Sequence, residues 1–254
     1  MGDLPGPRVS GTRAFINVGV DYGGPFNLKL SRNKSCKAYK LSHKEIIERY
    51  CSKNAIQWHF IPSYSPHMGG IWKAGIKSVK THLRKILGEA LLTFEEMYTI
   101  LTQTEAVLNS RPLTPVSANP DDLRALTPGH FLIGAPLNAI PQCSLLEQSV
   151  NQLTQFQYLT KLVQFFWFGW STEYLSNLQQ RMKWNREDTV SPVRIGSMVI
   201  LCEDHVPSMQ WPLGRIIECH PERDNKCRVI SIRTAKGIVT RAISKICILP
   251  IDIE

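Results

Sequence analysis

The chain has 254 residues, of which 43% are hydrophobic and 20% are charged, a composition that indicates a folded protein and excludes a disordered tail. No apolar run approaches the roughly eighteen residues that a membrane-spanning helix needs, and the first ten residues lack the apolar core of a secretory signal. The net charge is +9, with +10 on residues 1–90 and −1 on residues 91–254. This one-sided basic charge suits a polyanionic partner, with nucleic acid as the first candidate, and it equally suits a solubilising surface.

The first part of the chain alternates predicted strands and helices. Residues 15–30, "FINVGVDYGGPFNLKL", predict a β-hairpin, because an apolar run leads through a "GGP" turn into a second short strand. Asp21 stands at the end of the first of these strands. Residues 41–54 predict a helix with a capping box at its start, and residues 55–62 predict a further strand.

A basic amphipathic helix is predicted within residues 66–85, after the "HMGG" turn. At 100° per residue, four cations fall within an arc of ~60°: Lys73, Lys77, Lys80 and Arg84. Apolar residues form a separate stripe about a quarter-turn away: Ile76, Val79, Leu83, Ile86 and Leu87. The helix is therefore expected to bury one face and to present a row of cations on another.

Two further helices are predicted downstream. Thr93 and Glu96 form a capping box at the start of the first, which Pro112 stops. The second is amphipathic, carries many aromatic residues and runs from about Thr154 to Trp184. Between the two helices, the proline-rich residues 113–136 predict a connector with little regular structure.

Residues 190–250 contain five short apolar runs at close spacing, which predict a small β-barrel.

The seven cysteines and seven histidines of the chain include no pair spaced as CxxC or HxxxH, which argues against a zinc site. Cys219 and His220 are adjacent in one predicted strand and point to opposite faces, so we interpret them as structural. The cysteine pattern favours a reduced compartment, with cysteines buried as small hydrophobes.

Several long segments resemble the integrase region of Bel/Pao-type LTR retrotransposon polyproteins. The segments similar to the integrase core are "VGVDYGGPF" (18–26), "WHFIPSYSPHMGGIWKAGIKSVKTHLRKILG" (58–88), "LNSRPLTP" (108–115) and "LTPGHFLIGAPLN" (126–138). Two more, "MQWPLGRIIECHP" (209–221) and "IRTAKGIVTRAISKICILP" (232–250), resemble the domain that follows the core in that family. The resemblance covers nearly the whole chain, up to Pro250.

The resemblance implies an RNase H-like core in which an Asp, Asp, Glu triad holds Mg²⁺. It implies 3′-processing and strand transfer of element DNA into a host chromosome, so the expected partners are element ends and host DNA. Proteins of the family act as multimers, which makes a homo-oligomer an expectation here, and no membrane partner is expected. The location is nuclear or cytoplasmic; only the resemblance implies the nucleus, because no compact Lys/Arg cluster of about five to eight residues occurs.

The triad that the resemblance implies is incomplete in this chain. Asp21 matches the first Asp of the family. The second belongs to an "SDNGTNF"-like segment, but no Asp occurs between residues 22 and 120. By comparison with the family, a segment of strand, helix and Asp-bearing strand is missing near 40/41. Lys73 stands where the family has Glu, at the start of the basic helix. The other cations of this helix, Lys77, Lys80 and Arg84, fit contacts to DNA phosphates. We call these three residues the cation row.

Lys73 is unfavourable for metal binding on electrostatic grounds. An ammonium ~4 Å from a unit positive charge raises the energy by about 4 kcal/mol at an effective dielectric constant near 20, and a divalent ion doubles this. Asp21, as one carboxylate of three, cannot offset that repulsion. We therefore predict that Asp21 is the remnant of a metal site, that the chain holds no Mg²⁺ pair and that it is catalytically inactive as written.

The predicted fold class is α/β. It comprises an incomplete RNase H-like core at residues 1–140, a helical linker at 141–189 and a small SH3-like β-barrel at 190–254. The predicted function is that of a retrotransposon-derived integrase fragment that binds nucleic acid. Two alternatives stay open: a functional integrase whose gene prediction lacks a segment, and a domesticated protein- or chromatin-interaction module.

Overall fold

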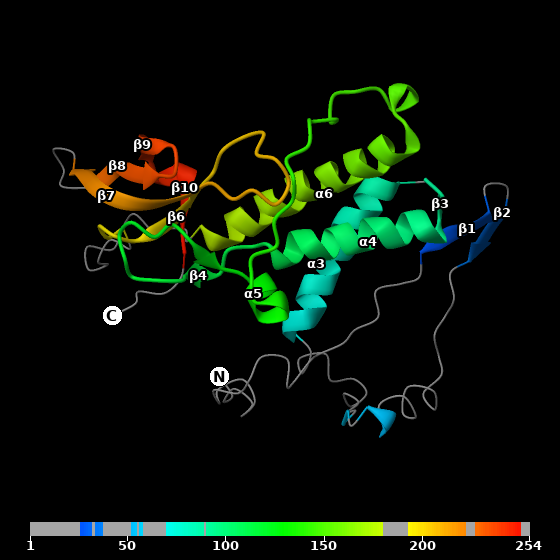
Figure 1. Cartoon of the computed structure of the whole chain (residues 1–254). Coiled ribbons are helices and arrows are strands. Elements are labelled where there is room, and N and C mark those ends of the chain that lie inside the picture. The colour runs from blue at the N-terminus through cyan, green and yellow to red at the C-terminus, as the bar shows by residue number, and fades with distance from the viewer. Residues whose placement is uncertain are drawn as a thin grey trace. The chain divides into compact units, whose positions relative to one another are not determined.

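The computed structural model of the chain describes residues 26–31, 34–37, 52–54, 56–57, 70–88, 90–179, 193–221 and 227–249 (Figure 1). The chain divides into two compact units, Met1–Tyr98 and Thr99–Glu254. Helices and sheets both occur among the described residues, which confirms the predicted mixed α/β class. The domain limits predicted at 140/141 and 189/190 stay predictions.

A three-stranded sheet lies in the first unit, in the order β2-β1-β3. Its strands are β1 (Asn27–Ser31), β2 (Lys34–Lys37) and β3 (Leu92–Thr93). Strand β1 is antiparallel to β2 and parallel to β3, and it corresponds to the second strand of the hairpin predicted at 15–30. The first strand of that hairpin, with Asp21, lies outside the described residues, as does nearly all of the helix and strand predicted at 41–54 and 55–62.

The predicted basic helix is confirmed as α3, Gly70–Leu87. Leu83 is 2% exposed and His82 is 8% exposed, while the rest of the predicted apolar stripe is half-buried. The helix is stopped just after Leu87 by Gly88, which has a left-handed backbone (φ 51°) and whose N–H donates to the Arg84 carbonyl at 3.0 Å. Glycine adopts this conformation without steric penalty, and it is a common helix stop.

The two helices predicted downstream are also present, as α4 (Phe94–Asn109) and α6 (Gln155–Leu178). The predicted capping box opens α4, because the Thr93 N–H donates to Glu96 Oε2 at 2.9 Å and the Glu96 N–H donates to Thr93 Oγ1 at 3.3 Å. Helix α6 begins after its cap Thr154, as predicted, but ends at Leu178, before the predicted Trp184. None of the helices in the described ranges is long and apolar enough to cross a membrane.

The predicted connector at 113–136 contains more regular structure than the sequence indicated. Strands β4 (Thr114–Pro115) and β5 (Ala125–Leu126) form an antiparallel pair, and helix α5 (Pro128–Ile133) follows. Thr127 caps this helix, a proline occupies its first position, and Gly134 ends it with a left-handed φ of 74°. The short 3₁₀ helix η2 (Val150–Gln152) then precedes α6.

A five-stranded antiparallel sheet in the second unit has the order β10-β6-β7-β8-β9. Its strands are β6 (Met198–Leu201), β7 (Leu213–Pro221), β8 (Cys227–Thr234), β9 (Gly237–Ala242) and β10 (Ile246–Ile248), with the 3₁₀ turn η3 (Ile243–Lys245) before the last. The five predicted strands are thus confirmed. The sheet is open in the described residues, because β9 and β10 form its two edges, whereas the sequence predicted a barrel.

Both faces of this sheet are buried at β6, whose "MVIL" run is buried at every position. Continuous apolar runs of this kind are typical of strands covered on both sides. One face carries a cluster built around Val199, Leu201, Ile216, Ile230, Ile232 and Ile246. The other face packs Met198 and Ile200 with Cys247 and Leu249 against α6 residues Tyr174, Leu175 and Leu178.

Candidate nucleic-acid interface

The cation row lies on α3, which places its side chains at successive turns of one helix. Lys77 and Arg84 are exposed and Lys80 is half-buried. Arg84 stands in the last turn of the helix, where a cation complements the helix dipole, and the first turn holds no acidic residue. Within the described ranges, no ion pair joins Lys77 or Arg84 to a carboxylate. These two side chains can therefore meet phosphate oxygens without first giving up a protein partner.

Lys73 occupies the first turn of the same helix and is half-buried. The structure thus brings Lys73 and the cation row together on one helix, whereas Asp21 lies outside the described residues. Among the residues that are described, no group of three or more His, Cys, Asp or Glu side chains is placed to hold a metal ion. The predicted absence of the Mg²⁺ pair stays a prediction, because Asp21 lies outside the described residues.

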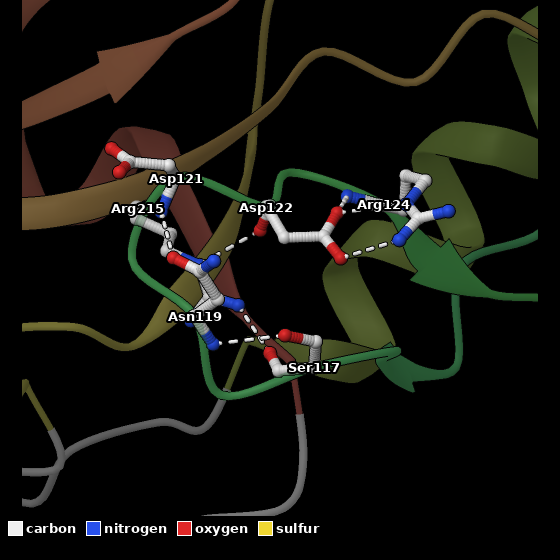
Figure 2. A network of polar contacts seen from close by, with 6 residues as sticks. All are labelled: Ser117, Asn119, Asp121, Asp122, Arg124 and Arg215. Atoms are coloured by element: carbon white, nitrogen blue, oxygen red, sulfur yellow. Dashed lines mark hydrogen bonds and ion pairs between the residues drawn. The ribbon is translucent and has the colours of Figure 1, made fainter.

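A second polar site, which the sequence did not indicate, surrounds Arg215 on β7 (Figure 2). Arg215 is 4% exposed, and its guanidinium donates to three backbone carbonyls. Nε donates to Asp122 O at 3.0 Å, and one terminal nitrogen donates to Gly196 O at 2.8 Å. The other terminal nitrogen donates to Ser117 O. Arg215 thus holds the β4–β5 loop onto the five-stranded sheet.

Short polar side chains give this loop its shape. The Asn119 N–H donates to Ser117 Oγ at 2.9 Å, and the Asp121 N–H donates to Asn119 Oδ1 at 3.0 Å (Figure 2). The Asp122 carboxylate accepts from the backbone N–H of Arg124 and from its guanidinium, at 2.9–3.0 Å. These hydrogen bonds from Arg124 lower the pKa of Asp122 to about 2. Such side-chain to backbone contacts stabilise turns without a regular ladder.

Aromatic rings join α6 to the chain just before β7. Trp170 stacks on Tyr174 with ring centroids 5.4 Å apart. Trp211 meets Trp167 edge-on at 4.8 Å and Tyr174 edge-on at 5.6 Å. Edge-to-face and offset-stacked pairs are the favoured arrangements of aromatic rings. The cluster therefore fixes α6 against the segment that leads into the sheet.

The polar atoms of these rings bind the "LNSRPLTP" segment that follows α4. Trp211 Nε1 donates to Ser110 Oγ at 3.3 Å, and the Tyr174 hydroxyl donates to Pro112 O at 2.6 Å. Burial raises the pKa of the Tyr174 phenol, so the hydroxyl keeps the proton that it donates. The "LNSRPLTP" segment thus serves as an anchor for α6 and the sheet.

Cys219 and His220 occupy β7 as the sequence predicted. His220 Nε2 lies 2.7 Å from Ser231 Oγ on the neighbouring strand β8, and Cys219 packs against the apolar cluster on the other face. Both contacts are those of structural side chains.

The buried position of Arg215 could have been predicted from the sequence, because a single arginine interrupts the otherwise apolar "WPLGRII" run. An arginine at an inward position of a buried strand requires hydrogen-bond acceptors. Two of its three acceptors, the carbonyls of Asp122 and Ser117, come from more than 90 residues earlier in the chain, and the sequence carries no local signal for that contact.

Comparison with known proteins reaches only the second part of the chain. A family model described as a family of unknown function (DUF5641) matches residues 154–249. No curated protein matches the chain, and neither does any solved structure. The match begins at the cap of α6 and ends at the last described residue after β10. The chain is therefore similar to this family over α6 and the five-stranded sheet. The cation row lies outside the match.

Proposed function

We propose that this chain is a nucleic-acid-binding protein derived from a Bel/Pao-type retrotransposon integrase and that it does not transfer DNA strands as written. The observation that carries the proposal is the cation row on α3, in which Lys77 and Arg84 are exposed and Lys80 is half-buried. It lies in a part of the chain with a large excess of positive charge. Phosphate contacts from lysine and arginine supply most of the affinity of non-specific DNA binding. A helix with an apolar stripe on one side and cations on another is suited to that task.

We further propose that the first part of the chain is an incomplete RNase H-like core and that the five-stranded sheet has an SH3-like topology that is open between its edge strands β9 and β10. The parallel pairing of β1 with β3 supports the first assignment, because parallel pairs are typical of α/β sheets. The strand order β10-β6-β7-β8-β9, with the 3₁₀ turn η3 before the last strand, supports the second. The bulges in β7, which bend and twist a strand, support it as well.

The salt dependence of DNA binding tests the cation row. For a random-sequence DNA duplex, we expect each of Lys77→Ala, Lys80→Ala and Arg84→Ala to reduce the slope of log K against log [salt] by about one unit. Alanine is a strong helix former, so α3 should stay intact in all three. Fluorescence anisotropy over a series of KCl concentrations measures the slope.

Lys85→Ala is the matched control, because Lys85 is exposed on the same helix but lies about 100° around the helix axis from Arg84. The slope of log K against log [salt] for Lys85→Ala should equal that of the unchanged chain. A salt-insensitive affinity, or equal losses for Lys85→Ala and the row variants, would contradict the proposed interface.

The absence of strand transfer is tested with Mg²⁺ or Mn²⁺ and a duplex that carries the terminal sequence of the parent element. We expect no nicked and no joined product, because the Lys73 ammonium opposes a divalent ion where the family has a carboxylate. Gel analysis of end-labelled DNA detects both products. A product that appears with the unchanged chain and disappears with Asp21→Asn would overturn this part of the proposal.

Two other functions remain as alternatives. A functional integrase whose gene prediction lacks a segment requires a transcript that inserts a strand, a helix and an Asp between Tyr39 and Leu41, and sequencing of that transcript decides it. A domesticated interaction module is favoured by the sheet edge β9, where Ile238 is 64% exposed. If the chain is such a module, we expect it either not to bind DNA or to bind DNA with an affinity that does not depend on salt.

A further inference from the structure

Two cysteines meet on the face of the five-stranded sheet that α6 covers. Cys247 lies on β10 opposite Ile200, and Cys202 follows two residues after Ile200. Because alternate residues of a strand point to the same face, both thiols face α6. Their sulfur atoms are 3.5 Å apart.

The environments of the two thiols differ. Cys247 is 1% exposed, and its Sγ lies 3.3 Å from the Leu175 carbonyl oxygen. Cys202 is half-buried and stands where the chain leaves β6. Gln179, at the end of α6, donates to Ser244 O at 2.9 Å, and its amide nitrogen is 3.9 Å from Cys202 Sγ. Cys202 is thus the more exposed residue of the pair, and Cys247 is the more buried one.

We propose that Cys202 and Cys247 are a redox-sensitive dithiol that a low-molecular-weight disulfide such as glutathione disulfide converts into an intramolecular disulfide. The Cys202 thiolate attacks one sulfur of glutathione disulfide, which breaks that S–S bond and releases one glutathione, protonated by water. Cys247 then loses its proton and attacks the Cys202 sulfur of the mixed disulfide, releasing the second glutathione. The protein loses two electrons and two protons, and both appear in the two glutathione thiols.

The order of attack follows from the surroundings of each sulfur. The hydrogen bond from Cys247 lowers the pKa of Cys202, and the positive charge of Lys245 lowers it further against the opposing effect of burial. The same hydrogen bond and burial raise the pKa of Cys247. Cys202 is therefore the more available thiolate as well as the more exposed one, and a thiolate is the attacking species in disulfide exchange.

The disulfide would join the sheet edge to its neighbour covalently. Strand β10 is only three residues long, and within the described residues it pairs with β6 alone. A bond between Cys202 and Cys247 closes a long loop that contains β7, β8 and β9, and such closures restrict the unfolded chain. Oxidation should therefore stabilise the second unit, and reduction should release its edge strand.

The test uses the full chain, fully reduced and then incubated with glutathione disulfide. Free thiols are then alkylated and the chain is cut with trypsin. By mass spectrometry we expect the peptides 195–215 and 246–254 to be recovered as one disulfide-linked pair, whose mass is that of the two reduced peptides minus two hydrogen atoms. We also expect the melting temperature of the oxidised chain to rise by about 5–10 °C and to return on reduction with dithiothreitol.

Variants separate this pair from the other thiols. Cys202→Ser replaces a partly exposed side chain and should abolish both the linked peptide and the rise in melting temperature. Cys143→Ser, at an exposed cysteine elsewhere in the unit, should keep both. Separate alkylated peptides, glutathione retained on Cys202, or a bond found only between Cys219 and Cys227 would each overturn the proposal in the unchanged chain, whether or not a variant folds.

Discussion

Arg215→Ala is expected to lower the free energy of unfolding of the second unit by about 3–5 kcal/mol. The Arg215 guanidinium is buried and satisfies the carbonyl groups of Asp122, Gly196 and Ser117. Its removal leaves these acceptors without a donor beside a cavity that the shorter side chain cannot fill. Urea unfolding followed by tryptophan fluorescence reports the change, because Trp167, Trp170 and Trp211 all lie in this unit.

Two further substitutions sharpen this test. Arg215→Lys keeps a charge but can reach fewer of the three carbonyls, so it should be destabilising by an intermediate amount. Arg241→Ala removes an arginine from the same sheet whose ion pair with Glu203, at 3.3 Å, has both side chains about 40% exposed. It should change the stability by no more than about 1 kcal/mol. Equal effects of Arg215→Ala and Arg241→Ala would mean that the buried anchor contributes no more than a surface ion pair.

Gly214→Ala is expected to destabilise the same unit by about 2–3 kcal/mol. Gly214 is buried on β7 and pairs with Val199 on one side and Thr234 on the other. A Cβ at this position would overlap a methyl carbon of Ile232 and would lie 2.8 Å from the carbonyl oxygen of Arg233. Because one of the opposing atoms belongs to the backbone, the strands must move apart to relieve the contact. Differential scanning calorimetry gives the loss in melting temperature.

Gly75→Ala is the matched comparison for Gly214→Ala. Gly75 lies in the interior of α3, and a Cβ there meets nothing within 4 Å. Alanine should therefore stabilise that helix by about 0.5–1 kcal/mol, through the lower conformational entropy of its unfolded state. An unchanged melting temperature for Gly214→Ala would show that β7 and β8 separate more easily than the contact distances indicate.

The parts of the fold that local patterns determine could be predicted from the sequence. Helix α3 was predicted from its "GG" turn and apolar stripe, and α4 from the Thr93 and Glu96 capping box, since these signals act within one or two turns. The five strands of the second unit were predicted from the spacing of apolar runs. What they form together, an open sheet of the order β10-β6-β7-β8-β9, depends on pairings between distant residues.

The β4–β5 pair was missed for the same reason. Its two-residue strands are too short for a periodic signal, and Arg215 holds the loop between them from about 90 residues away. The contact between Cys202 and Cys247 likewise depends on the register of β6 with β10. For the candidate site, the helical placement of the cation row was predictable because it lies within one helix. The role of Asp21 as the remnant of a metal site stays a prediction, because Asp21 lies outside the described residues.

The hydrogen bonds of Trp211 and Tyr174 to the chain after α4 determine how this protein can be cut into autonomous pieces. A fragment trimmed to residues 154–249, the range of the family match, would keep the indole and the phenol but lose their acceptors at Ser110 and Pro112. It would also keep Arg215 while losing two of the three carbonyls that Arg215 binds. We therefore expect that the boundary of sequence similarity is not a boundary of folding and that the shortest piece of the second unit that folds alone begins upstream of Ser110.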